Sequence, residues 1–338
     1  MLNYFRVEQV LHQFVAGHIL WMLFLFHGDY MNTPNLNLVE LTEQFGTDEK
    51  CRKALEQLRW KDGAKCPRCD SAATPIANRF QYDCDSCHYQ FSVTAGTIFH
   101  DSHLSLWKWF VATALLCEAK KGMSACQVQR TIGVSYKTAW YLCHRIRAAM
   151  VETNKPKLDG KVEMDETYVG GQNSGRGRHR RLENKEIVIG IRQRNGELRL
   201  FHSKDVKAKT LAKYIRENVS EDAEVIFRDD YPSYPGAVKR AGMEPRKHKP
   251  INHSKRIYVM GDTHTNTIES AFSLFKRGVR GTWHHISAKH LASYLEEMSF
   301  RFNNRKNPYL FRDTILKLIA SPNLEYKKLT AQQSESAA

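Results

Sequence analysis

The stretch that decides the fold is residues 161–171, KVEMDETYVGG. Apolar and β-branched residues run along it to a pair of glycines, which predicts a β-strand that ends in a sharp turn. Asp165 lies in this stretch where a side chain leaves the edge of a sheet. Because a single aspartate is usually solvated, its meaning depends on acidic residues elsewhere in the chain.

Two further stretches carry an acid in a comparable position. Residues 224–234, EVIFRDDYPSY, form a β-branched run that closes on Asp229 before a Tyr-Pro turn. Residues 263–278, THTNTIESAFSLFKRG, have helical periodicity that places Glu269 and Lys276 on one polar stripe. Carboxylates that converge from two strands and a helix make a site for hard divalent cations. Such sites commonly carry out phosphoryl transfer on nucleic acid.

Each of the three acids has a rival close by in the sequence. Glu166 and Asp230 directly follow the first two acids, and side chains alternate along a strand, so we expect both to face the opposite side of the sheet. Asp262 is the rival of the third acid. The helical position of Glu269, and the lysine on the same stripe, favour Glu269 over Asp262.

The chain is strongly basic. Its 338 residues contain 51 Lys and Arg against 36 Asp and Glu, for a net charge of +15. An excess spread along the whole chain favours a polyanionic partner, and nucleic acid rather than a membrane. No stretch reaches the ~20 apolar residues that a membrane span needs. We therefore expect a cytoplasmic protein that does not enter a membrane.

Residues 1–30 differ in character from the rest of the chain. Their apolar segment, residues 14–26, resembles the hydrophobic core of a signal peptide, but no cleavage site of small residues follows it. Met31 begins a more ordinary polar segment. We expect translation to start at Met31 and treat residues 1–36 as an atypical N-terminal extension.

Two CxxC pairs predict a structural metal site. They are CPRC at residues 66–69 and CDSC at residues 84–87, with fourteen residues between them. Such a spacing delivers four thiolates to one tetrahedral zinc ion and leaves no open position for catalysis. The predicted zinc ligands are Cys66, Cys69, Cys84 and Cys87. The four remaining cysteines lie in helical patterns, and we expect them to be small buried hydrophobic residues.

Residues 123–150, MSACQVQRTIGVSYKTAWYLCHRIRAAM, predict two helices joined at Gly133, with Ser124 and Ser135 as N-caps. In a helix-turn-helix, the first outward residues of the second helix contact bases in the major groove. This predicts base contacts for Tyr136, Lys137 and Thr138, and phosphate contacts for Arg145 and Arg147. The alternative is an ordinary helical hairpin with a solvated basic face.

The order of these patterns predicts a multidomain α/β protein. The expected strands are residues 161–169, 186–193, 197–202, 224–229 and 256–260, and the expected helices of this part are residues 208–218, 266–276 and 287–304. They describe a mixed sheet with helices on its faces. We divide the chain into the extension at 1–36, helices and zinc ribbon at 37–100, a helix-turn-helix region at 101–154, a catalytic domain at 155–312 and a C-terminal tail at 313–338.

At these motifs the chain resembles the DDE transposases of bacterial insertion sequences, and within them the ISXO-like group. The resemblance rests on MDETYVGG, DDYPSY, HTNTIESAFSLFKRGVRGTWHHIS and RFNNR, and covers about residues 37–312. It implies a zinc ribbon and a helix-turn-helix ahead of a ribonuclease-H-like catalytic domain. It also implies an acidic triad that maps onto Asp165, Asp229 and Glu269, with Lys276 as the basic residue that comes after it.

The resemblance further implies a reaction and a partner. Two Mg²⁺ ions held by the triad would support cleavage at the ends of the element, followed by attack of the freed 3′-OH on target DNA. The partner would be double-stranded DNA, bound by a homo-oligomer at the nucleoid. Residues 175–181, GRGRHRR, are a basic segment in which Arg176 and Arg178 are candidates for gripping the DNA backbone; a solvated loop is the alternative.

Two other functions remain open on the sequence. One is a DNA-binding regulator, with a zinc ribbon and a helix-turn-helix, whose α/β domain does not catalyse. The other is a nuclease that hydrolyses DNA without strand transfer.

Overall fold

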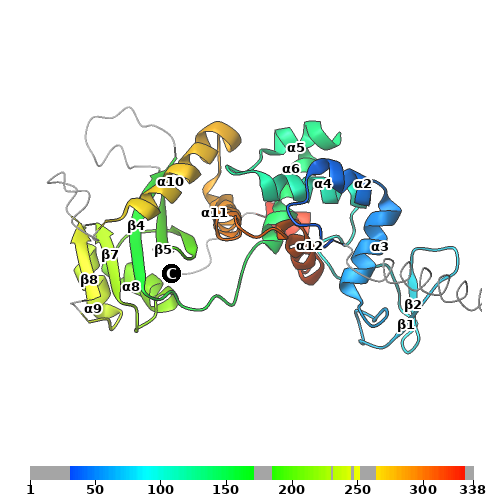
Figure 1. The fold of residues 1–338 in the computed structure, drawn as a ribbon, viewed down its shortest axis with the longest axis horizontal. Helices are drawn as coiled ribbons and strands as arrows, with labels where there is room; N and C mark the ends of the chain where they lie inside the picture. The colour runs from blue at the N-terminus through cyan, green and yellow to red at the C-terminus, as the bar shows by residue number, and fades with distance from the viewer. Residues whose placement is uncertain (1–30, 171–184, 230, 245–246, 252–263, 332–338) are drawn as a thin grey trace, which may run out of the picture.

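The structure is a computed structural model, and it describes residues 31–170, 185–229, 231–244, 247–251 and 264–331. Several expectations fall outside the described residues: the extension over residues 1–30, Arg176, Arg178, Asp230, Asp262 and the strand expected at 256–260. Within the described ranges, no helix is long and apolar enough to cross a membrane. Figure 1 shows the α/β sheet at one end of the molecule, with the N-terminal helices and ribbon at the other.

The N-terminal part begins with two short helices and the ribbon. Helix α2 (Leu38–Phe45) is capped by Asn37, and α3 (Asp48–Arg59) by Thr47, whose side chains accept hydrogen bonds from the first turns. The ribbon consists of strands β1 (Ala73–Pro75), β2 (Tyr82–Cys84) and β3 (Gln90–Phe91). They pair in the order β1-β2-β3, both pairs antiparallel.

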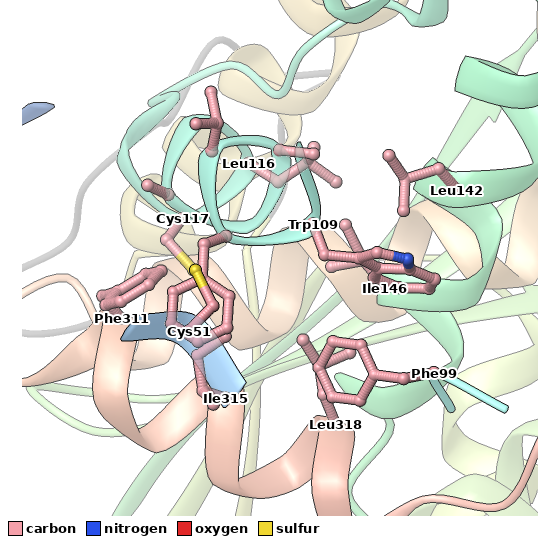
Figure 2. Close-up of a cluster of buried hydrophobic side chains, with 14 of the residues drawn as sticks. Cys51, Phe99, Trp109, Leu116, Cys117, Leu142, Ile146, Phe311, Ile315 and Leu318 are labelled. Atoms are coloured by element: carbon pink, nitrogen blue, oxygen red, sulfur yellow. The ribbon is translucent and has the colours of Figure 1, made fainter. Parts of the chain in front are cut away.

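A helical core comes after the ribbon. It contains α4 (Leu106–Glu118), α5 (Ala125–Ile132), α6 (Tyr136–Ala149) and α12 (Leu310–Ala320). Figure 2 shows side chains of α4, α6 and α12 meeting in one cluster. Its buried members include Trp109, Leu142, Ile146, Phe311, Ile315 and Leu318.

The prediction of a C-terminal tail from residue 313 is therefore wrong. Helix α12 extends to Ala320 and packs its apolar face into the core built by residues 31–150. A second short helix, α13 (Tyr326–Thr330), comes after it. The partners of α12 lie far away in the sequence, which is why the local pattern did not reveal them.

The α/β part is a mixed sheet, as the sequence predicts, and the described residues contribute five strands to it, of which the strand at His248–Ile251 was not predicted. Its strands are β4 (Lys161–Val169), β5 (Glu186–Gln193), β6 (Leu198–Ser203), β7 (Val225–Asp229) and β8 (His248–Ile251). They lie in the order β6-β5-β4-β7-β8. The β6-β5-β4 half is antiparallel and includes the predicted hairpin, whereas β4, β7 and β8 are parallel.

Helices cover both faces of this sheet. One face packs against α8 (Ala208–Asn218) and α9 (Ser233–Arg240), the other against α10 (Asn266–Gly278) and α11 (Ala288–Asn303). Helix α11 also contacts α6, so it joins the sheet to the helical core. Figure 1 shows α11 between the two parts. The central strand β4 and helix α10 position the candidate site.

Candidate active site and metal centre

The zinc ribbon brings its four cysteine sulfurs together. The Sγ atoms of Cys66, Cys69, Cys84 and Cys87 all lie within 4.8 Å of one another. The Sγ of Cys69 is 3.4 Å from that of Cys84 and 3.5 Å from that of Cys87. Ligands at ~2.3 Å from a tetrahedral zinc ion lie roughly 3.8 Å apart, so the four sulfurs fit this ion.

The rest of the ribbon is a small aromatic cluster. Tyr82 and Phe91 stack with ring centroids 6.0 Å apart, and the ring of Trp60 meets that of Tyr82 edge-on at 4.8 Å. Hydrogen bonds from Ser71 lower the pKa of the Cys69 thiol to about 6, whereas hydrogen bonds with the other three cysteines raise the pKa of the Cys87 thiol to about 12. A lowered thiol pKa favours the thiolate that binds metal. Three two- to three-residue strands and this cluster are a small core, so we expect the metal to contribute much of the ribbon's stability.

The three acids singled out in the sequence line one cavity of about 450 Å³. Asp165 lies on the central strand β4, Asp229 is the last residue of β7, and Glu269 is in the first turn of α10. Lys276, two turns further along α10, lines the same cavity. The structure thus brings together side chains from three elements that are far apart in the sequence.

The strand pairing explains why the first two acids meet. Met164 of β4 pairs with Arg228 of β7 in a parallel register, so the next residues, Asp165 and Asp229, emerge side by side. On the other side of β4, the pairing partner of Asp165 is Gly190. A Cβ atom at Gly190 would lie 2.7 Å from the side chains of Ile268 and Phe272 on α10. The missing side chain therefore lets α10 approach the sheet directly beside Asp165.

The acids perturb one another. The Asp165 side chain keeps some exposure at the cavity, but burial raises its pKa well above the usual range, and Glu166, Asp229 and Glu269 raise it further. Its Oδ1 accepts a hydrogen bond of 2.9 Å from the backbone N–H of Glu166, which acts in the opposite direction. Such mutual repulsion around a buried carboxylate is typical of sites built for a cation.

Cations stand beside the acids on α10 and on the short π-helix that comes directly after it, Val279–Trp283. Burial lowers the pKa of Lys276, as does the charge of Arg280, whereas Asp165 raises it. Arg277 and Arg280 also line the cavity, and both are exposed. The sequence reasoning passed over these two arginines, although Arg280 lies four residues after Lys276 and so on the same helical stripe.

Glu166 faces the side of the sheet opposite to Asp165, as expected from strand alternation. Its Oε2 accepts a hydrogen bond of 3.0 Å from the hydroxyl of Tyr234 on α9, the helix on the opposite face from α10. Tyr234 is fully buried, and sequence reasoning did not pick it out although it closes the DDYPSY stretch. Glu166 still reaches the rim of the cavity.

The two candidate metal sites differ in their geometry. In the cysteine cluster, the four ligand atoms already lie within 4.8 Å of one another. Among the described residues, this is the group of three or more potential metal ligands that lie so close together. The carboxylates of the acid cavity surround an open space instead. Oxygen donors around a roomy cavity suit a hard divalent cation that keeps sites for water and substrate.

Comparison with known proteins places the chain in a family. Residues 157–303 match the model of the ISXO2-like transposase domain, and residues 46–90 match that of the transposase zinc-ribbon domain. Together these segments cover more than half of the chain. This protein is an insertion-sequence transposase of the ISXO2-like family. The transposase domain contains β4, β7 and α10, and hence Asp165, Asp229 and Glu269 as well as Glu166, which lines the same cavity.

Two individual proteins are similar to this transposase. The first is the "Uncharacterized protein in transposable element ISH50" of Halobacterium salinarum, which is 27% identical over 279 residues, covering 76% of this chain and 91% of the relative. The second is a chain of the "Crystal structure of a pre-cleavage Mos1 transpososome", aligned over 62% of this chain and 75% of that one. The latter match has 11% identity and a TM-score of 0.24.

Helices α5 and α6 begin at the N-cap residues that the sequence predicts, and they are joined at Gly133. The hydroxyl of Ser124 accepts a hydrogen bond from the backbone N–H of Gln127 at 3.1 Å, and that of Ser135 accepts one from Thr138 at 3.1 Å. Gly133 ends α5 with a φ of 61°, a left-handed conformation that glycine adopts without strain. The first turn of α6 is open to solvent: Tyr136, Lys137 and Thr138 are all exposed.

The predicted outward position of Arg145 and Arg147 is wrong. Arg145 is 3% exposed and donates to the backbone oxygen of His100 at 2.6 Å and to Asn323 Oδ1 at 2.8 Å. Arg147 is 1% exposed, and its Nε lies 2.5 Å from Glu297 Oε2 on α11. Since α6 is packed between α11 and α12, its last two turns have no outward face. Neither arginine is available to a DNA phosphate.

The other cysteines also differ from one another. Cys51, Cys117 and Cys143 are buried as expected, and burial raises the pKa of Cys51 to about 12. Cys126, in the first turn of α5, is exposed, so the prediction of a buried residue is wrong there.

Proposed function

We propose that the acid-lined cavity is the catalytic centre at which this transposase cuts and joins DNA, with Asp165, Asp229 and Glu269 as its acidic triad. One observation supports this above the others: three acids from two strands and a helix line a single cavity together with Lys276. Local sequence patterns singled out the same residues.

The cavity suits divalent cations, and we propose that it holds two Mg²⁺ ions. Asp165 is flanked by carboxylates that raise its pKa, and a cation among them would relieve this repulsion. Two ions bound there would supply activation of the attacking oxygen and stabilisation of the leaving oxygen. Asp165, Asp229 and Glu269 would hold these ions, with Asp165 on the central strand and Asp229 on the strand next to it.

Basic residues of α10 and of the π-helix after it, Val279–Trp283, would hold the DNA beside the acids. Lys276 is half-buried against the cavity, in reach of a phosphate whose charge grows in the transition state. Arg277 and Arg280 are exposed at the rim and would contact neighbouring phosphates. These contacts position the backbone and read no sequence.

We propose that the N-terminal part recognises the ends of the element as double-stranded DNA. The exposed first turn of α6 would act as the reading end of a helix-turn-helix, with Tyr136, Lys137 and Thr138 at the bases. The ribbon would bind a structural zinc ion through its four cysteines. The mixed sheet, with its first strand at its centre, would be the ribonuclease-H-like sheet that the resemblance implies. We also propose that the transposase pairs two ends as a homo-oligomer.

The decisive experiment is product analysis with the element's terminal repeats. Purified protein, Mg²⁺, labelled terminal-repeat DNA and a plasmid target are incubated, and the products are separated. A transposase yields 3′-OH ends and labelled DNA joined to the plasmid. A regulator that does not catalyse would bind the repeats without cutting them, and a simple nuclease would leave hydrolysed ends with no joined product.

Recognition by α6 is tested separately. The double change Lys137→Ala and Thr138→Ala should weaken specific binding of terminal-repeat DNA by roughly 1–3 kcal/mol for each base that the helix no longer contacts. Lys213→Ala serves as the matched control, because Lys213 is an exposed lysine on α8 on the other side of the sheet domain. Equal binding by both variants in a gel-shift titration would rule out α6 as the reading helix.

A further inference from the structure

Glu163 lies on β4 two residues before Asp165 and is completely buried. Its Oε2 accepts three hydrogen bonds from the start of α10: 3.0 Å from the backbone N–H of Thr267, 2.7 Å from the Thr267 hydroxyl and 3.0 Å from the N–H of Ile268. Its Oε1 lies 2.8 Å from Arg194 Nε and 3.4 Å from His264 Nδ1. A glutamate of the sheet thus occupies the N-terminus of the active-site helix.

Helix α10 has no side-chain cap of its own. Thr265, its N-cap residue, makes no capping hydrogen bond, and its hydroxyl donates instead to Glu269 Oε1 at 3.0 Å. The first N–H groups of a helix need partners and carry partial positive charge, so a carboxylate is a strong partner for them. Glu163 supplies this partner from another element. Its hydrogen bonds therefore attach the start of α10 to β4, whereas a capping residue of the helix itself would stabilise only the helix end.

Arg194 extends the same network to the third element. Its guanidinium lies 4.1 Å above the ring of Phe227 on β7, and its Nη2 donates to the backbone oxygen of His264 at 2.9 Å. Phe227 is the pairing partner of Glu163 across the two parallel strands. The network therefore touches β4, β7 and α10, the three elements that carry the acids.

The positions of the network residues share one spacing. Glu163, Phe227 and Thr267 each stand two residues before one of the proposed catalytic acids, Asp165, Asp229 and Glu269. On a strand, residues two apart share a face, and in the first turn of a helix they are separated by about 3 Å along the axis. The contacts among Glu163, Phe227 and Thr267 therefore help to fix the distances between the three acids, each of which comes two residues later in the chain.

We propose that Glu163 is a positioning residue, which locks the start of α10 onto β4 and so holds Glu269 at the correct distance from Asp165 for shared metal binding. This inference rests on the proposed function. The simpler interpretation is that Glu163 only stabilises the fold. A buried, paired carboxylate is a costly means to that end, whereas a Ser or Asp at the N-cap would stabilise the helix locally. Unlike a local cap, Glu163 also joins β4 to α10 through its hydrogen bonds.

The test compares Glu163→Gln with Glu297→Gln. Glu297 is equally buried and pairs with two arginines, but it lies on α11 away from the acid cavity. Three quantities are measured for each protein: Mn²⁺ binding by electron paramagnetic resonance titration without DNA, Mg²⁺-dependent cleavage of terminal-repeat DNA per folded molecule, and binding of that DNA.

We expect Glu163→Gln to weaken Mn²⁺ binding at least tenfold, and to lower cleavage per folded molecule by about 100-fold, which is the effect of a ~1 Å misplacement. Raising the Mg²⁺ concentration should restore part of the cleavage. Glu297→Gln should leave both quantities within about twofold of the wild type per folded molecule. DNA binding per folded molecule should be unchanged in Glu163→Gln, because its changed side chain lies in the sheet part and not in the helices that are proposed to bind the element's ends.

A milder variant keeps the inference testable should Glu163→Gln not fold. Thr267→Val removes one of the three hydrogen bonds to Glu163 and should weaken Mn²⁺ binding in the same direction. Unchanged Mn²⁺ binding in the variants, or a parallel loss in Glu297→Gln, would overturn the positioning role. Cleavage that requires Asp165 but ignores Glu163 would refute this inference alone, and Mn²⁺ binding by a wild type that never cleaves DNA would refute the proposed function alone.

Discussion

Replacing Glu297 with Gln tests how helix α6 is joined to the sheet part. Glu297 of α11 is 0% exposed, and its two carboxylate oxygens pair with different arginines: Oε2 with Arg147 of α6 at 2.5 Å, and Oε1 with Arg301 at 3.1 Å. Arg147 also lies 4.0 Å above the ring of Tyr294. Burial alone would lower the pKa of Arg147, but pairing with Glu297 outweighs it and raises this pKa above the ordinary value.

The expected cost comes from this burial. Removing one member of a buried ion pair leaves an uncompensated charge and costs about 3–5 kcal/mol. The matched control is Glu49→Gln, which breaks an ion pair with Lys53 of similar length, 2.9 Å, whose side chains are 63% and 61% exposed. A pair as exposed as this one is screened by solvent and contributes little to stability.

The assay is urea unfolding followed by tryptophan fluorescence, since Trp109 lies in the core of the helical part. We expect the Glu297→Gln midpoint to fall far below that of the wild type, while Glu49→Gln stays close to it. A loss below ~1 kcal/mol for Glu297→Gln, equal to the control, would refute the view that this triad holds α6 to α11.

Three further predictions rest on single residues. Gly190→Ala should lower stability by about 1–3 kcal/mol and reduce DNA cleavage, because the new Cβ would lie 2.7 Å from Phe272; thermal melting checks this, and Phe272→Leu should recover part of the loss. Cys66→Ser should remove about one bound zinc and weaken DNA binding, as measured by metal analysis and gel shift; full zinc retention would show that Cys66 is not a ligand. Burial, with the charges of Arg147 and His290, lowers the pKa of His144 to about 2. The unfolded chain therefore takes up a proton that the folded chain does not, and stability should fall by up to ~1.4 kcal/mol per unit as pH drops below about 6.5; His144→Phe should flatten this slope, and exposed His285→Gln should not.

Sequence reasoning located the cavity because each acid carries a local signal. Asp165 lies within a run with strand character, although in the middle of the central strand and not at the sheet edge that we expected; Asp229 closes another such run and Glu269 lies at the start of a helix, so periodicity assigns each to an element. Parallel pairing of β4 and β7 then brings the first two together, and Gly190 admits the third. The four zinc-binding cysteines could be predicted from the sequence just as well, because the spacing of two CxxC pairs is typical of a tetrahedral zinc site.

The rest depended on contacts between distant segments. Arg147 reads as a surface cation within its helix, and becomes a core residue because Glu297 meets it from 150 residues away. Glu163 likewise reads as an ordinary polar residue of a strand until its bonds to Thr267 and Ile268 are seen. Helix α12 was taken for a tail because its partners come from the N-terminal part. Buried charge pairs leave no periodic trace in a sequence, and only the fold reveals them.

The most direct test of the central claim, that the acid cavity is the catalytic site, is Mg²⁺-dependent cleavage of terminal-repeat DNA by Asp165→Asn, with end binding measured on the same sample. Asp222→Asn, an exposed aspartate after α8, is the matched control. We predict that Asp165→Asn binds the ends as the wild type does but neither cuts nor joins DNA, while Asp222→Asn keeps full activity. Full cleavage by Asp165→Asn in Mg²⁺ would contradict the assignment of the cavity.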